Sequence, residues 1–146
     1  MKLKAKKLKE FDIVANVYDE LKKTLRTPIL LEVPMIGRVV DLAYLKNNRV
    51  FTIEFKIKDL NKALKQAKDH LLGADFVYIC VPPRKIPSEV RKLLQAEGIG
   101  LMFYVKGAKK SIKTVIRAKQ SKETWPVLRM DVMQYIKSGQ KKYAKN

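Results

Sequence analysis

Three short, apolar-rich runs between residues 28 and 58 are typical of β-strands, and the third shows the alternating side-chain pattern of a strand most clearly. The runs read PILLEVPMI, RVVDLAYL and RVFTIEFKIK, and the dipeptides Ile36-Gly37 and Asn47-Asn48 connect them. Glycine and asparagine tolerate positive φ, so both connections suit tight hairpins. The pattern therefore predicts a three-stranded meander.

Helical periodicity appears on both sides of this meander. Residues 10–25 carry apolar side chains three and four positions apart, and the Thr-Pro step that follows ends the helix, because the residue before proline avoids the helical region. Residues 59–74 predict a second helix, with Asp59 as its N-cap.

The remaining chain adds further strands and helices. The run DFVYICV at residues 75–81 is continuously apolar, as expected of a strand buried on both faces. A helix at 87–99 and a strand at 100–105 follow, and the tail predicts a strand in SIKTVIRAK and a helix from residue 126.

The predicted order is αβββαβ, with further α and β elements at the C-terminus. The third and fourth strands are joined through a helix and should be parallel. We expect an α/β fold, a mixed central sheet flanked by helices. At 146 residues the chain suits one domain, with a core of about residues 10–105 and a basic extension of about 106–146.

The hairpins also predict which residues face one another. If Asn47 and Asn48 form the turn, paired residue numbers add up to 95 and Asp41 lies opposite Glu54. Lys56 then lies on the same face. The glycine turn places Glu32 opposite Asp41, so three carboxylates form one row. The same alternation assigns an apolar set to the other face: Val40, Leu42, Tyr44, Phe51, Ile53 and Phe55.

Carboxylates that face each other directly destabilise a sheet. A divalent cation would compensate this row, and so would the neighbouring Lys56. The alternative is a solvated face with incidental pairing. One cysteine and one histidine exclude an intrachain disulfide and a Cys- or His-rich metal site. If a metal binds, oxygen ligands must hold it, which favours Mg²⁺ or Mn²⁺ over Zn²⁺.

Charge suggests the class of partner. Lysine and arginine number 32 against 14 acidic residues, a formal charge of +18 that favours nucleic acid first and an acidic membrane surface second. Residues 98–122 contain no acidic residue. With no apolar run near membrane-spanning length and no signal-peptide pattern, we expect a cytoplasmic protein. The expected phosphate contacts come from Lys58, Lys109, Lys110, Lys113, Arg117 and Lys119.

The stretch GRVVDLAYLKNNRVFTIEFK resembles the PD-(D/E)xK nuclease superfamily, which has the restriction-endonuclease-like fold and includes archaeal Holliday-junction resolvases. Asp41 matches its acidic residue, and Glu54-Phe55-Lys56 matches its second half. Val40 stands where the motif's name has proline. The resemblance implies that Asp41 and Glu54 bind Mg²⁺ and that Lys56 assists the attacking water.

The resemblance also implies roles for other acidic and polar groups. Gln66 on the helix after the motif is a further catalytic candidate, with an ordinary helix-surface residue as the alternative. Glu32 is a third metal-ligand candidate, and Glu20 on the first helix is a weaker one. His70 is expected to be a packing or surface residue rather than a catalyst.

The implied activity is metal-dependent endonucleolytic hydrolysis of DNA, on branched or otherwise structured substrates of repair and recombination. Two alternatives stay open: an inactive nucleic-acid-binding module on the same fold, and a basic RNA- or ribosome-associated protein. A homodimer is also open, since the segment around residues 125–136 has apolar side chains to spare.

Overall fold

The computed structural model describes residues 9–144, with residues 140–144 described by their backbone only. A six-stranded mixed sheet with the strand order β1-β2-β3-β4-β5-β6 forms the centre. The elements in chain order are α1 (Glu10–Leu25), β1 (Ile29–Met35), β2 (Arg38–Lys46), β3 (Arg49–Phe55), α2 (Leu60–His70), β4 (Phe76–Val81), α3 (Ser88–Glu97), β5 (Gly100–Tyr104), β6 (Ile112–Ile116) and α4 (Pro126–Ala144).

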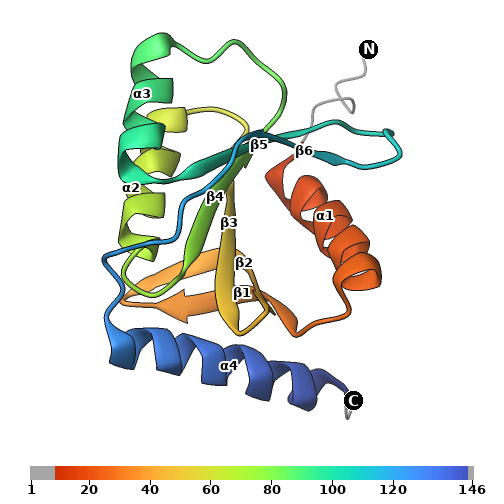
Figure 1. Ribbon diagram of the computed structural model, residues 1–146. Coiled ribbons are helices and arrows are strands. Elements are labelled where there is room, and N and C mark those ends of the chain that lie inside the picture. Colours follow the sequence, from red (N-terminus) through yellow and green to blue (C-terminus); the bar gives the residue numbers. More distant parts are fainter. Residues whose placement is uncertain (1–8, 145–146) are drawn as a thin grey trace.

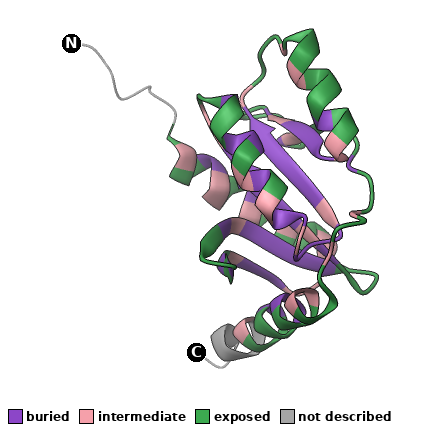
Figure 2. Ribbon diagram, turned by 90° about the vertical axis from the view of Figure 1, so that its left-hand side faces the viewer, coloured by how far each residue is buried: buried purple, intermediate pink, exposed green. Residues whose placement is uncertain are grey.

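Helices cover both faces of the sheet (Figure 1). On one face α1 packs over β1, β2 and β3. On the other face α2 lies over β3 and β4, α3 lies over β5, and α4 crosses β1 and β2. The strands between these layers are largely buried and the outer sides of the helices exposed (Figure 2). No helix within residues 9–144 is long and apolar enough to cross a membrane.

The predicted topology is confirmed. β1, β2 and β3 form an antiparallel meander, and β3 pairs with β4 in parallel. Asn47 and Asn48 both have positive φ, as expected of the hairpin turn they form, and Lys46 pairs with Arg49 across it. Asp59 caps α2 by accepting a hydrogen bond from the Lys62 backbone N–H.

The strict alternation predicted for β2 is wrong around Asp41. Val40 packs with Ala43 and Leu45 on the face that α2 and α4 cover, whereas Leu42 packs on the α1 face. Under a period of two, Val40 and Leu42 would share a face. The strand therefore slips by one position at Asp41, which sets this carboxylate at the boundary of the two faces.

The predicted Glu32–Asp41 pair is also missing from the β1–β2 ladder. The neighbouring pairs Leu31–Leu42 and Val33–Val40 are in the predicted register, but Glu32 between them has a left-handed φ of 52°. That conformation is rare for a residue with a Cβ and breaks the local pairing. The three-carboxylate row expected from the hairpins therefore does not form.

His70 is buried on the inner side of α2, a position that agrees with packing, and neither ring nitrogen has a hydrogen-bond partner within residues 9–144. Burial lowers the pKa of His70 to about 4. Below about pH 6.5 the unfolded chain takes up a proton that the folded chain refuses, so stability should fall as pH drops from about 6.5 to 4.

Replacement of His70 by Leu should reduce the decrease in unfolding free energy between pH 7.0 and pH 4.5 by on the order of 2–3 kcal/mol. Urea unfolding at pH 7.0 and at pH 4.5 measures it. An equal pH dependence in the variant and the wild type would contradict the assignment of the acid loss to this imidazole.

Candidate metal and phosphodiester site

Asp41 and Glu54 lie together where β2 and β3 separate. Their backbones are not paired there, since the β2–β3 ladder runs from Lys46–Arg49 to Leu42–Ile53. Instead, the Phe55 backbone N–H donates to Asp41 Oδ2 at 2.8 Å. The carboxylate of Asp41 thus takes the place of a backbone acceptor and is fixed against β3.

Glu54 is 4 % exposed, and its Oε1 has no hydrogen-bond partner. It points to the face that α2 covers, together with Val50, because alternate residues of β3 share a face. A buried carboxylate oxygen without a partner is costly for the fold. The site therefore contains an acceptor atom that no group within residues 9–144 satisfies.

Burial and mutual repulsion make this pair hard to ionise. Burial first, and then the charge of Asp41, raise the pKa of Glu54 to about 8. Burial also raises the pKa of Asp41, although the hydrogen bond from Phe55 opposes the shift. A proton or a cation between the two carboxylates would relieve the repulsion.

Lys56 follows directly after β3, and its backbone N–H donates to the Cys80 carbonyl at 3.1 Å. This bond extends the parallel pairing of β3 and β4 by one step and holds the residue beside the pair. The ammonium charge of Lys56 lowers the pKa of both Asp41 and Glu54. The predicted juxtaposition of two carboxylates and one lysine is therefore present.

A third acidic residue that the sequence did not single out lies close by. Glu10, the first residue of α1, accepts a hydrogen bond from the Ile57 backbone N–H at 3.0 Å. Its charge contributes to the raised pKa of both Asp41 and Glu54. An acidic residue in a first helical turn is common for reasons of the helix dipole, so nothing in the pattern distinguished it.

The two other acidic candidates lie elsewhere. Glu32 is exposed on β1. Glu20 accepts hydrogen bonds from the Ser111 backbone N–H at 3.0 Å and from its hydroxyl at 2.7 Å. Glu20 thus ties α1 to the start of β6. Arg38 at the start of β2 forms an ion pair with Asp69.

Gln66 lies on α2, and its side-chain Oε1 is buried without a hydrogen-bond partner. It borders a surface cavity of about 450 Å³, which Arg38, Lys62 and Lys65 also line. Asp59 lines the same cavity, so Gln66 borders a space of mixed charge on the helix that covers Glu54. This position is compatible with the predicted catalytic role, which stays a prediction.

The residues present fit a magnesium ion better than a zinc ion. Within residues 9–144 no group of three or more His, Cys, Asp and Glu side chains is arranged to hold a metal. Mg²⁺ is commonly bound by one or two carboxylates, with waters and substrate phosphates completing its shell. Asp41 and Glu54 match that requirement, and the unsatisfied Oε1 of Glu54 offers a ligand atom.

The predicted basic residues lie on the surface. Lys58 is exposed in the turn between β3 and α2. Lys109 and Lys110 occupy the β5–β6 loop, which extends past α1 in Figure 1. Lys113 is exposed on β6, and Arg117 and Lys119 are exposed just beyond its end. Their contacts with nucleic acid stay predictions.

No family model matches the sequence, and no curated protein matches it either. Among solved structures, the fold is similar to the crystal structure of a repair endonuclease from Pyrococcus abyssi, with a TM-score of 0.47 and 20 % sequence identity. The alignment covers 65 % of this chain and 46 % of that one, so this chain spans less than half of that structure's length. A similarity of this size carries no conclusion about activity, which has to be argued from the site.

Proposed function

We propose that the protein is a metal-dependent endonuclease that hydrolyses phosphodiester bonds in DNA. The observation that carries this proposal is the buried carboxylate pair of Asp41 and Glu54, with an unsatisfied oxygen on Glu54 and Lys56 beside it. Such a pair is unfavourable by itself and becomes favourable when it binds a cation.

Asp41 and Glu54 would hold Mg²⁺ or Mn²⁺, with the Phe55 backbone carbonyl as a further oxygen ligand. A bound divalent ion activates water and neutralises phosphate charge, which is the chemistry that phosphodiester hydrolysis needs. The hydrogen bond from the Phe55 N–H orients the Asp41 carboxylate, so this ligand is positioned before any ion arrives.

Lys56 would stabilise negative charge on the phosphate and help to orient or deprotonate the attacking water. Its backbone is held by Cys80, so the side chain leaves the sheet at a defined place. Electrostatic stabilisation by a preorganised cation contributes strongly to such reactions. Gln66 would orient substrate or water from α2.

The charge of +18 supports a polyanionic substrate. The exposed lysines of the β5–β6 loop extend the basic surface beyond the immediate site. We place branched or structured DNA first among the substrates, in repair or recombination, and a homodimer would allow symmetric cutting of two strands. The second candidate is a non-cleaving nucleic-acid-binding module, which the same charge supports.

A cleavage assay tests the proposal. Supercoiled, linear, single-stranded and four-way-junction DNA are incubated with the protein in Mg²⁺, in Mn²⁺ and in chelator. We expect metal-dependent cutting of at least one substrate and a loss of about 100-fold or more for Asp41→Ala and Lys56→Ala. Lys46→Ala, which removes an exposed lysine at the far end of β2, should retain activity.

Two outcomes would overturn the endonuclease assignment. Either no substrate is cut under any metal condition, or cutting persists unchanged in Asp41→Ala and Lys56→Ala. DNA binding without cutting would favour the non-cleaving module.

A further inference from the structure

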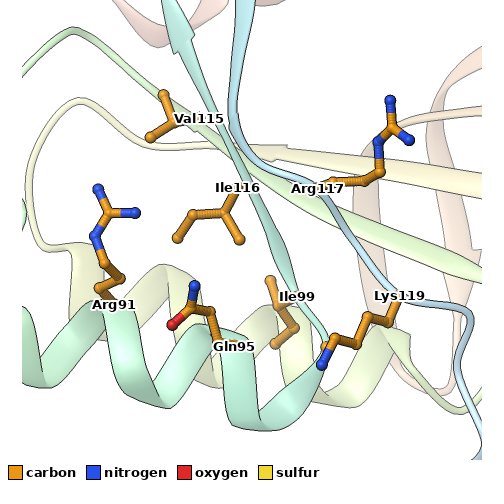
Figure 3. A pocket seen from close by; sticks show the side chains of 8 residues that line it. Arg91, Gln95, Ile99, Val115, Ile116, Arg117 and Lys119 are labelled. Atoms are coloured by element: carbon orange, nitrogen blue, oxygen red, sulfur yellow. The ribbon is translucent and has the colours of Figure 1, made fainter.

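A second groove lies between α3 and β6, away from the carboxylate pair, with a volume of about 470 Å³. Figure 3 shows Arg91 and Gln95 rising from the same side of α3, with Val115 and Ile116 facing them from β6. Lys119 closes one end of the groove. Residues 91 and 95 are one helical turn apart, which places their side chains side by side.

The groove is positively charged. Its lining contains Arg91 and Lys119 and no acidic residue, while Arg117 at its border points away from α3 in Figure 3. The nearby Glu97 is engaged with Lys68, with 3.7 Å between its Oε2 and the lysine Nζ. Arg91 and Lys119 form no ion pair within residues 9–144, so both can receive an anion.

The lining of the groove is mainly polar, with a small apolar floor and one side-chain amide. Ile99 and Ile116 are buried, and Val115 packs beside them. Gln95 is exposed and supplies both a donor and an acceptor. A pocket of this size with a small apolar floor and several polar groups has room for a small planar molecule that also carries polar groups. Cations at its ends add a requirement for negative charge.

The strand register separates this groove from the carboxylate pair. Glu54 pairs with Ile79, Ile79 with Leu101, and Leu101 with Ile116, so these residues form one row across the sheet. Three strand spacings of about 4.8 Å place Ile116 about 14 Å from Glu54. A ligand in the groove therefore lies outside the proposed reaction centre.

We propose that this groove binds one nucleotide of a single-stranded nucleic-acid segment. Arg91 and Lys119 bind the flanking phosphates, the base lies over the half-buried Val115, and Gln95 hydrogen-bonds the base edge. The assignment does not depend on cleavage by the carboxylate pair. The groove would hold an unpaired nucleotide next to the nucleic-acid segment that binds at the carboxylate pair.

Binding of fluorescent oligodeoxythymidylate in chelator tests this site, because cleavage cannot occur there. The double variant Arg91→Ala/Lys119→Ala should bind the oligonucleotide at least about 10-fold more weakly than the wild type. The slope of log K against the logarithm of the salt concentration should also decrease in magnitude by about 1–2. Lys92→Ala removes a neighbouring exposed charge of α3 outside the groove and should lose much less affinity.

Recognition of the base is tested with Gln95→Leu and with an abasic oligonucleotide of equal length. We expect Gln95→Leu to weaken binding of the thymidylate oligomer and to leave the abasic oligomer unaffected. Equal binding of both oligomers by the wild type would overturn a nucleotide site, as would equal losses for the double variant and Lys92→Ala. If the wild type cleaves DNA but the groove variants bind the oligonucleotide as tightly as the wild type does, the groove site is overturned and the endonuclease proposal stays intact.

Discussion

Replacement of Glu54 by Gln should abolish metal-dependent cleavage, by about 100-fold or more, and at the same time stabilise the metal-free fold. Glutamine has nearly the same shape as glutamate but cannot ionise. The Glu54 side chain accepts a hydrogen bond from the Asp41 backbone N–H. Glutamine keeps an oxygen for this bond and gains an N–H that can donate to the Asp41 carboxylate. The substitution therefore removes the repulsion between the two carboxylates, and it also removes one of the two proposed metal ligands.

The stability gain should depend on pH in a defined direction. Because the pKa of Glu54 is raised from 4.5 to about 8 in the folded protein, the folded state binds more protons than the unfolded state between these values. Wild-type stability then falls as pH rises through this window and levels off above it. The variant lacks this fall, so its advantage should be larger at pH 8.5 than at pH 5.5, by about 1–3 kcal/mol.

Urea unfolding of both proteins at the two pH values, in chelator, measures this difference. Glu123→Gln makes the same chemical change at an exposed position and should alter stability equally little at both pH values. Adding Mg²⁺ should stabilise the wild type and leave Glu54→Gln unchanged, since a ligand stabilises only the fold that binds it. A pH-independent gain for Glu54→Gln would contradict the raised pKa.

Replacement of Arg129 by Met should cost about 3–5 kcal/mol of folding free energy, because it leaves a buried carboxylate without its cation. Asp75 has a side chain 4 % exposed, and Arg129 Nε lies 2.9 Å from its Oδ2. The same carboxylate accepts the Val50 backbone N–H at 2.7 Å, and Arg129 Nη2 donates to the Asn48 carbonyl at 2.8 Å. These bonds attach α4 to the turn that starts β3.

Thermal or urea unfolding followed by circular dichroism measures the effect, and a loss of this size lowers Tm by about 10 °C or more. Arg38→Met is the matched control, since Arg38 and Asp69 form an ion pair in which both side chains are 46 % exposed. That pair should contribute no more than about 1 kcal/mol. Similar losses for the two variants would contradict the role assigned to burial at Asp75.

Local patterns were sufficient for much of the fold and for the proximity of Asp41 and Glu54. Alternation and turn residues placed Asp41 across from Glu54, because a two-residue asparagine turn leaves one register for the following strand. The helix after this motif implied a parallel fourth strand, which β3 and β4 form. Each of these inferences concerns residues that are close in sequence.

The expectation for Glu32 was wrong in its geometry for a physical reason. Counting residues assumes an unbroken ladder, but Glu32 adopts a positive φ and the face alternation slips at Asp41. The hydrophobic pattern does not reveal such irregularities, because the residues that flank Glu32 and Asp41 are apolar whether the strand is regular or irregular there.

The sequence by itself determined the order of helices and strands, the hairpin register and the basic charge, because these follow from periodicity, turn chemistry and composition. The tertiary structure decided the contacts between distant segments. It brought Glu10 of α1 beside the carboxylate pair, joined Arg129 of α4 to Asp75, and formed the groove between α3 and β6. Such contacts depend on how helices pack across the sheet, and that packing is set by the whole core rather than by any local run of residues.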